Sequence, residues 1–219
     1  MRHLSDINLT KHEKLGNKAE FYLLELNPDS LFVFSKVFGN SNPVRMEIGC
    51  GRGRFLMEKS LAMPDVNFLG FEPKLKRVKL LLQQFDMAKQ PNIRLIRSFV
   101  KQDITRWIPG ASIQKVYIQH PDPWPKRRHT ANRLIQPRFL DALAYIMEAG
   151  GKVQITTDNA PYVKWIREHF HQNEKFRLIR DNRPESNHVV TFFEEIKKKE
   201  GFKQHYMEFE RIDEMKELM

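Results

Sequence analysis

The chain has 219 residues, with 37 lysines and arginines against 27 aspartates and glutamates, so it carries a formal net charge of +10 and has a pI of about 9.7. A positive charge of this size favours a polyanionic partner, nucleic acid before a membrane surface. The single cysteine, Cys50, excludes a disulfide framework, and no apolar run approaches the roughly eighteen residues of a membrane span. We therefore expect a soluble cytoplasmic protein. The scattered histidines have no zinc-binding spacing, so we expect no metal.

Predicted strands and helices alternate along most of the chain. Residues 1–42 are expected to be an N-terminal extension packed on the main domain, with short helices at 20–26 and 30–38. Within the expected domain, residues 43–219, strands are predicted at 44–48, 67–71, 93–97, 113–119, 152–156, 176–180 and 203–211. Helices are predicted at 54–61, 74–89, 101–107, 137–147, 160–170 and 191–199. This order predicts an α/β fold with a doubly wound, mostly parallel sheet of seven strands.

A glycine-rich turn follows the first strand of this domain, in the sequence Glu47-Ile48-Gly49-Cys50-Gly51-Arg52-Gly53. Glycines at alternate positions let the backbone approach a ligand that a side chain would block. The helix expected from Arg54 presents its N-terminal amides at the same place. The turn alone is weak evidence, but the strand before it and the helix after it favour a binding site. Cys50 is interpreted as a small packing residue.

Glu72 ends the next strand, about twenty residues after the glycines. An acid at that distance binds the ribose hydroxyls in nucleotide-binding βαβ units. A carboxylate suits the task because it accepts hydrogen bonds from both hydroxyls. The alternative is an acid that caps the following helix, and the matching distance favours the ribose role.

A proline-rich stretch, residues 120–128, follows the strand at 113–119 and reads His-Pro-Asp-Pro-Trp-Pro-Lys-Arg-Arg. Three prolines in five residues exclude helix and further strand pairing, so the Asp122 carboxylate sits on a stiff backbone. Trp124 offers a flat surface on which a base can stack. Basic residues follow without an intervening acid: Lys126, Arg127, Arg128, Arg133 and Arg138. This pattern favours a site that handles one base of an anionic polymer, and the alternative is a proline-rich loop with a solvated basic face.

These motifs together resemble the bacterial tRNA (guanine-N7)-methyltransferases, which use S-adenosylmethionine to modify the variable-loop guanine at position 46. The most specific resemblance lies in residues 121–129 and 133–137; Thr157-Asp158, Arg183-Pro184 and the segment 191–194 match further family motifs. The resemblance covers about residues 44–211 and implies a Rossmann-like class I methyltransferase fold. It further implies that tRNA is the partner, that neither membrane nor metal is involved, and that the protein is a monomer or homodimer.

The resemblance also implies roles for individual residues. Asp122 would be the catalytic residue and would lie near the cofactor. The cofactor would contact Glu47, Gly49, Gly51, Glu72, Phe99 and Asp122. The substrate would contact Lys126, Asp158, Thr191, Phe192, Phe193 and Glu194, and the RNA would contact Arg127, Arg128 and Arg133.

The chain departs from the family pattern in two places. The family usually has Asp or Asn after the third strand of the domain, for the adenine end of the cofactor, and this chain has Phe99 there, beside Ser98. We therefore expect the adenine to be held by stacking or by backbone groups. Residues 185–190 lengthen the spacing between Arg183-Pro184 and the segment that begins at Thr191.

Two other functions are compatible with parts of the sequence. Another class I methyltransferase, acting on rRNA or protein, would use the same glycine turn and Glu72, and the stretch around Asp122 argues against it. A non-catalytic RNA-binding protein of the same fold would lack cofactor-binding groups. Glu47, Glu72 and Asp122 are all present, and Phe99 is the feature in its favour.

Overall fold

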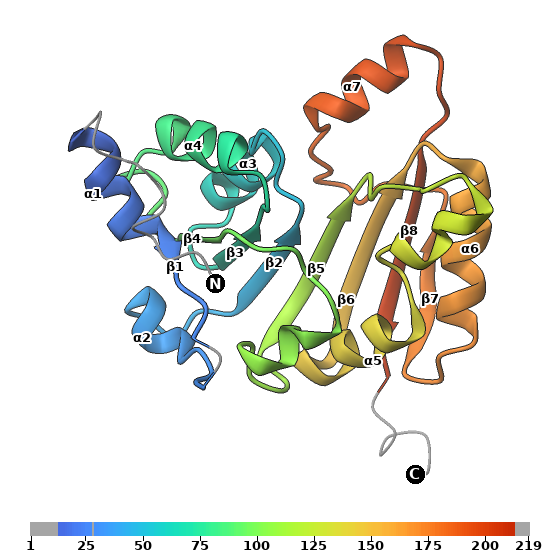
Figure 1. Ribbon diagram of the computed structural model, residues 1–219, viewed down its shortest axis with the longest axis horizontal. Coiled ribbons are helices and arrows are strands. Elements are labelled where there is room, and N and C mark those ends of the chain that lie inside the picture. The colour runs from blue at the N-terminus through green and yellow to red at the C-terminus, as the bar shows by residue number, and fades with distance from the viewer. Residues whose placement is uncertain (1–12, 28, 213–219) are drawn as a thin grey trace.

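One eight-stranded sheet organises the computed structural model, which describes residues 13–27 and 29–212 (Figure 1). The strand order is β1-β4-β3-β2-β5-β6-β8-β7, and β8 runs antiparallel to both of its neighbours while the other pairs are parallel. The strands are β1 Leu23–Leu24, β2 Val44–Ile48, β3 Asn67–Phe71, β4 Ile93–Ile96, β5 Ile113–Gln119, β6 Met147–Thr157, β7 Phe176–Asp181 and β8 His205–Arg211. The predicted mostly parallel α/β sheet is confirmed.

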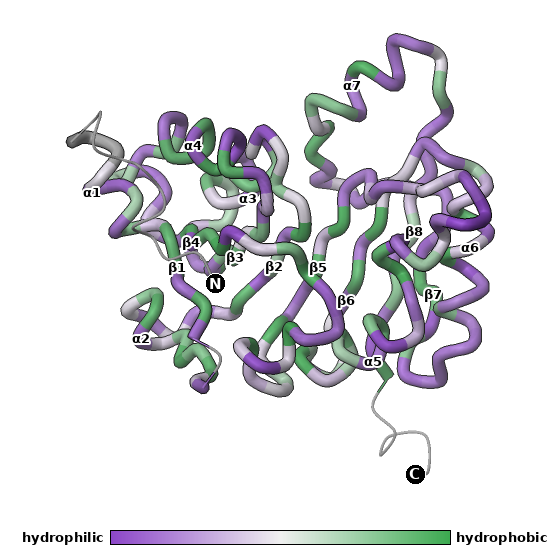
Figure 2. Tube along the Cα trace, in the orientation of Figure 1, coloured by the Kyte–Doolittle hydropathy of each residue, from purple (hydrophilic) through white to green (hydrophobic). Residues whose placement is uncertain are grey.

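Helices cover both faces of the sheet. They are α1 Glu13–Tyr22, α2 Phe34–Phe38, α3 Arg54–Ala62, α4 Leu75–Gln84, α5 Pro137–Ile146, α6 Ala160–His171 and α7 Phe192–Lys199, with 3₁₀ turns η2 Gln102–Arg106 and η3 Arg127–Asn132. One apolar core joins α5 and α6 to residues such as Val116 and Ile118. A second core joins α1, α3 and α4 to the opposite face, where it includes Tyr117. Hydrophobic stretches accordingly follow the strands in Figure 2, with hydrophilic residues on the surrounding helices and loops.

The eighth strand is absent from the sequence prediction, which placed a helix at 20–26. The helix ends instead at Tyr22, and β1 pairs with β4 through Leu23 opposite Leu95 and Leu24 opposite Ile96. A two-residue strand is too short to show alternation, and its state is set by the sheet edge that it meets. The boundary expected after residue 42 stays a prediction.

Several other element boundaries also differ from the prediction. The second helix begins at Phe34 rather than residue 30, and α4 ends at Gln84 because Phe85 turns to extended backbone while its ring stays buried. The strand predicted from residue 152 begins at Met147 and contains Gly150 and Gly151. The helix 101–107 is a 3₁₀ turn over 102–106.

The parallel strands β2, β3 and β5 end level with one another. Ile48 lies in register with both Phe71 and Ile118, so the residues that follow these strands emerge at one edge of the sheet. Figure 1 shows α7 beyond this edge, near the ends of β5 and β6. Open α/β sheets bind ligands at the edge where their parallel strands end.

None of the helices in the described ranges is long and apolar enough to cross a membrane.

Candidate active site

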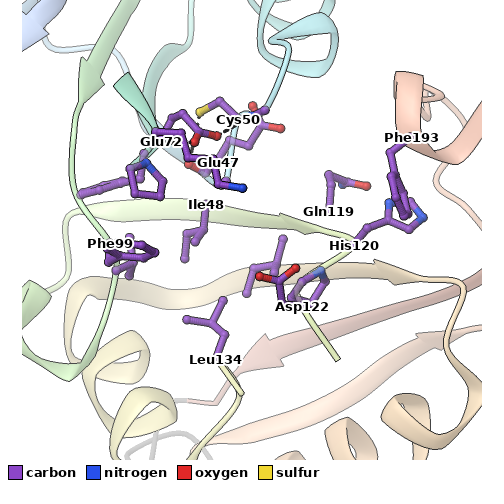
Figure 3. A pocket seen from close by; sticks show the side chains of 18 of the residues that line it. Glu47, Ile48, Cys50, Glu72, Phe99, Gln119, His120, Asp122, Leu134 and Phe193 are labelled. Carbon is purple, nitrogen blue, oxygen red and sulfur yellow. Dashed lines mark hydrogen bonds between the residues drawn. The ribbon is translucent and has the colours of Figure 1, made fainter. Parts of the chain in front are cut away.

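A cavity of about 1160 Å³ opens at the carboxyl ends of the strands (Figure 3). It brings together eleven residues that the sequence indicated: Glu47, Gly49, Gly51, Glu72, Phe99, Asp122, Arg133, Asp158, Thr191, Phe192 and Phe193. Lys126, Arg127, Arg128 and Glu194 are not among the lining residues. The volume exceeds the 300–1,000 Å³ common for small-molecule sites, which leaves room for a cofactor and part of a second ligand.

The glycine turn forms one wall of the cavity with its backbone. Gly49 and Gly51 have φ of 84° and 56°, a left-handed conformation that glycine adopts without strain. The amides of Gly49 and Cys50 both donate to the Phe71 carbonyl, at 2.8 and 3.1 Å, so the turn is tied to β3. Apart from Gly49 itself and its two chain neighbours, no described residue has a heavy atom within 4 Å of the place where a Cβ of Gly49 would be. The backbone is therefore open to a ligand.

Glu72 fixes the turn from the end of β3. One carboxylate oxygen accepts the Gly51 amide at 2.9 Å, and the other accepts the Lys74 amide at 2.9 Å, at the N-terminus of α4. The bond to Lys74 matches the capping interpretation and the bond to Gly51 points the carboxylate into the cavity. Each oxygen keeps a further lone pair for a ligand donor. The ribose and capping interpretations are thus compatible.

Glu47 is buried beside Glu72, as Figure 3 shows. Burial raises the pKa of the Glu47 carboxyl to about 8, and the nearby Glu72 charge adds to the rise, while the Cys50 thiol opposes it through a hydrogen bond. Oxygen Oε2 of Glu47 has no hydrogen-bond partner within the described residues. A buried polar atom without a partner costs free energy, and a ligand donor would satisfy it.

Asp122 stands on a strained loop. His120 and Trp124, two residues to either side, have φ of 50° and 42°, and each such non-glycine residue costs roughly 1–3 kcal/mol. The prolines between them keep the loop from relaxing. Within residues 13–27 and 29–212 the Asp122 carboxylate has neither a hydrogen bond nor a salt bridge, so it is available to a ligand in the cavity.

Comparisons with known proteins agree on one family. A family model described as "Putative methyltransferase" matches residues 41–208. A tRNA (guanine-N(7)-)-methyltransferase of Syntrophotalea carbinolica is 33% identical over 164 residues, which make up 75% of this chain and 70% of that protein. The protein of the same description from Bradyrhizobium diazoefficiens is 30% identical over 176 residues, 78% of this chain and 74% of that one. The chain belongs to the tRNA (guanine-N7)-methyltransferase family.

Solved structures show that the methyltransferase fold of this family member is shared more widely. The 16S rRNA methyltransferase KamB has a TM-score of 0.64 at 13% identity, over 84% of this chain and 95% of its own. A mutant 16S rRNA (adenine(1408)-N(1))-methyltransferase with cosubstrate SAM, from Catenulisporales acidiphilia, has a TM-score of 0.55 at 14% identity, over 87% and 94%. At these identities the likeness concerns the fold.

The cavity of this methyltransferase contains groups that suit the adenosyl and ammonium parts of S-adenosylmethionine. The open backbone of Gly49 offers a surface for a flat adenosyl group, and the unpartnered Glu47 Oε2 offers an acceptor for an ammonium group. Phe99 stands at the cavity with 71% of its surface exposed, where a ring can stack. No group of three or more His, Cys, Asp or Glu side chains in the described residues is placed to hold a metal.

Arg133, one of the three predicted RNA contacts, packs against the protein itself, and its contact with RNA stays a prediction. Its guanidinium donates to the Pro123 carbonyl at 2.8 Å and packs over the Trp165 ring, with 4.5 Å from the guanidinium carbon to the ring centroid. It therefore holds the strained loop that carries Asp122. Arg127 and Arg128 lie in η3 with exposed side chains, where RNA can reach them.

The segment 191–194 is divided between two environments. Thr191 caps α7 by accepting the Glu194 amide at 3.1 Å, while Phe192 and Phe193 line the cavity. Glu194 is fully buried, and its carboxylate accepts hydrogen bonds from Tyr206 at 2.6 Å and His188 at 2.8 Å. Substrate contact through Glu194 stays a prediction. The Glu194 carboxylate links α7 to Tyr206 on β8.

Gln119 and His120 are among the cavity residues to which the sequence reasoning gave no role. Gln119 ends β5 with both amide atoms unpartnered among the described residues, and His120 packs its ring 4.9 Å from that of Phe193. The His120 Nε2 faces the Gln204 Oε1 at 2.8 Å, and burial lowers the pKa of this histidine. Their position, between a buried strand and the prolines, was the available signal.

Replacing Arg133 by Gln is expected to lower the free energy of unfolding by about 1–3 kcal/mol, because the loop carbonyls lose a charged donor and Trp165 loses its cation. Replacing the neighbouring exposed Arg127 by Gln serves as the matched control and should change stability by less than about 0.5 kcal/mol. Urea unfolding of the wild type and both variants measures this. Equal midpoints for Arg133→Gln and Arg127→Gln would show that Arg133 does not brace the loop.

Proposed function

We propose that this protein transfers the methyl group of S-adenosylmethionine to N7 of the variable-loop guanine, position 46, of tRNA. Membership of the family supports the reaction, and its members in Syntrophotalea and Bradyrhizobium carry that name. The observation that carries the proposal for this chain is the unpaired carboxylate of Asp122, held in one cavity with Glu47, Glu72 and the open glycine turn. A monomer or homodimer acting on tRNA in the cytoplasm is the form that we infer.

Cofactor binding is assigned to the glycine turn and the two acids. Glu72 would accept hydrogen bonds from the ribose hydroxyls with its remaining lone pairs, and Gly49 and Gly51 would pass beneath the adenosine. Glu47 would accept the cofactor's ammonium group, whose positive charge favours the ionised carboxylate and so lowers its pKa from about 8. Phe99 would stack on adenine, which replaces a polar contact by an apolar one.

The chemistry asks more of position than of proton transfer. S-adenosylmethionine supplies an electrophilic methyl on a sulfonium. The new bond joins that methyl to the N7 lone pair as the carbon–sulfur bond breaks, and no proton has to leave. Asp122 would accept hydrogen bonds from guanine N1–H and the 2-amino group, hold the base in line with the methyl, and balance the positive charge that the guanine gains.

The substrate side of the cavity would take a guanine that has left its tertiary contacts in tRNA. Bases that enzymes modify are commonly extruded into a pocket and stacked between apolar side chains. Asp158, Phe192 and Phe193 line the cavity, and Lys126 is exposed at the start of η3. We assign substrate contact to these four residues and phosphate contact to Arg127 and Arg128.

The alternatives receive less support. An rRNA methyltransferase is the description of the structural neighbours at 13–14% identity, which concerns fold alone. A non-catalytic RNA-binding protein would have no need for an unpaired Asp122 on a strained loop, nor for an open glycine turn with its acids in place. Phe99 is the feature in favour of the non-catalytic protein, and a stacking role accounts for it.

Replacement of Asp122 by Ala should leave cofactor affinity near the wild-type value but lower methyl transfer at least about a hundredfold, because an oriented contact to the transition state is lost. Unmodified tRNA transcript, labelled cofactor and nucleoside mass spectrometry measure the transfer. Borohydride and aniline treatment then cleaves the RNA at N7-methylguanosine and locates the site. Label on another atom or position would refute the assigned reaction, and full activity of Asp122→Ala would remove this residue from its centre.

Replacement of both Arg127 and Arg128 by Gln should make the slope of log tRNA-binding constant against log salt concentration less steep by up to about two, about one for each phosphate contact. The matched control is Arg177→Gln on β7, an exposed arginine away from the cavity, whose removal should leave the slope unchanged. Filter binding at a series of salt concentrations gives the slopes. A double variant that keeps the wild-type slope would show that these arginines are only a solvated face.

A further inference from the structure

The loop between β7 and α7 lies over a polar part of the sheet. Beneath it, Lys115 on β5, Gln154 on β6 and Glu208 on β8 are all buried, with 8%, 3% and 2% of their surface exposed. The loop contains residues 185–190, the stretch that lengthens the spacing before Thr191. Val189 of this loop is buried in the apolar core that includes Phe55 and Tyr117. Hydrogen bonds and ion pairs add to this apolar contact at residues 185 and 187.

Glu185 is the centre of these contacts. One of its carboxylate oxygens accepts a hydrogen bond from Lys59, and the other accepts one from Lys115 at 2.7 Å. Lys59 also donates to the carbonyl and the side-chain oxygen of Asn187, at 2.9 and 3.1 Å. Lys115 also donates to Glu208 at 2.7 Å. Removing one partner of a buried, multiply hydrogen-bonded ion pair lowers the free energy of unfolding more than removing one partner of an exposed pair does.

The two lysines belong to the segments that build the cavity. Lys59 lies on α3, the helix that follows the glycine turn, and Lys115 lies on β5, the strand that leads to Asp122. The loop itself leads into Thr191 and α7. Glu185 therefore connects the cofactor side, the Asp122 side and the roof of the cavity, although it is not itself a lining residue.

The first turn of α7 follows this loop directly and carries two aromatic rings of the cavity. Phe192 and Phe193 line the cavity, and the Arg52 guanidinium lies 4.0 Å from the centroid of the Phe192 ring. Figure 3 shows Phe193 above His120, at the side of the cavity away from Phe99. A shift of the loop would move both rings relative to Asp122.

We propose that Glu185 is a positioning residue for the RNA substrate: by joining Lys59 to Lys115 it fixes the loop 185–190 and sets the Phe192 and Phe193 rings at the distance from Asp122 that a guanine needs. The expected effect on KM for tRNA rests on the proposed function. The expected effect on the loop and α7 rests on the contacts alone. Glu185 acts through α7 and touches neither cofactor nor base.

The test compares three variants in one loop. Glu185→Gln removes the charge and keeps the shape, Asn187→Ala removes one acceptor of Lys59 and keeps both ion pairs, and Ser186→Ala is the matched control, an exposed residue. Hydrogen exchange measures the protection of α7. Steady-state methyl transfer gives KM for tRNA and kcat, and titration with S-adenosylhomocysteine gives cofactor-site affinity.

Glu185→Gln should speed exchange in α7 and raise KM for tRNA about 10- to 100-fold, since small misplacements of substrate-holding groups have effects of that size. Its kcat should change less, and its S-adenosylhomocysteine affinity should stay within about twofold, because the cofactor contacts are not touched. Asn187→Ala should act in the same direction by about 2- to 10-fold. Ser186→Ala should match the wild type.

Unchanged α7 exchange in the Glu185 and Asn187 variants would overturn the proposal, as would faster exchange with an unchanged KM for tRNA. A parallel loss of kcat and S-adenosylhomocysteine affinity in both variants would also overturn it, because it would indicate general damage to the fold. If Glu185→Gln does not fold, Asn187→Ala decides by the same two measurements. Failure of the wild type to methylate tRNA would refute the proposed function instead, and α7 exchange would still decide whether Glu185 holds the loop.

Discussion

The parallel pairing of β2 with β3 and β5 is the constraint on which the site depends. Ile48 lies in register with Phe71 and with Ile118, so three segments that are distant in sequence end at one level. Glu47 at the end of β2, Glu72 after β3 and Asp122 after β5 meet at one cavity for this reason. A shift in the register of a single strand would separate the acids, however favourable each local sequence remained.

Two kinds of packing support this edge. Apolar cores on both faces make the strands and their helices rigid, while the loop 183–191 and α7 are fastened to the sheet by polar contacts through Glu185 and Glu194. Arg133 supplies a third fastening, to the loop around Asp122. The cofactor side thus rests on backbone geometry, and the side assigned to guanine rests on side chains that hold loops in place.

The distribution of apolar residues was enough to place most strands. The strands β2, β3 and β5 are almost wholly buried, and glycine or proline follows each of them within two residues. Most of the site residues that the sequence indicated line the cavity, and Glu47, Glu72 and Asp122 could be found because they lie at or just after the ends of such runs. Tertiary contacts decided what the sequence did not show: the two residues of β1, the early end of α4, the inward turn of Arg133, and the burial of Glu194. An arginine in a basic run has the same local pattern whether its side chain lies in solvent or on a tryptophan ring, so only the fold distinguishes Arg133 from Arg127.

We propose that one cavity holds the cofactor on the glycine turn with its reactive end toward Asp122. A crystal structure of the protein with S-adenosylhomocysteine tests it most directly. We expect ribose hydroxyls about 2.6–3.2 Å from the Glu72 carboxylate oxygens, and a sulfur atom on the side of the cavity that faces Asp122. A nucleoside bound elsewhere, with Glu72 bonded only to the amides of Gly51 and Lys74, would contradict it.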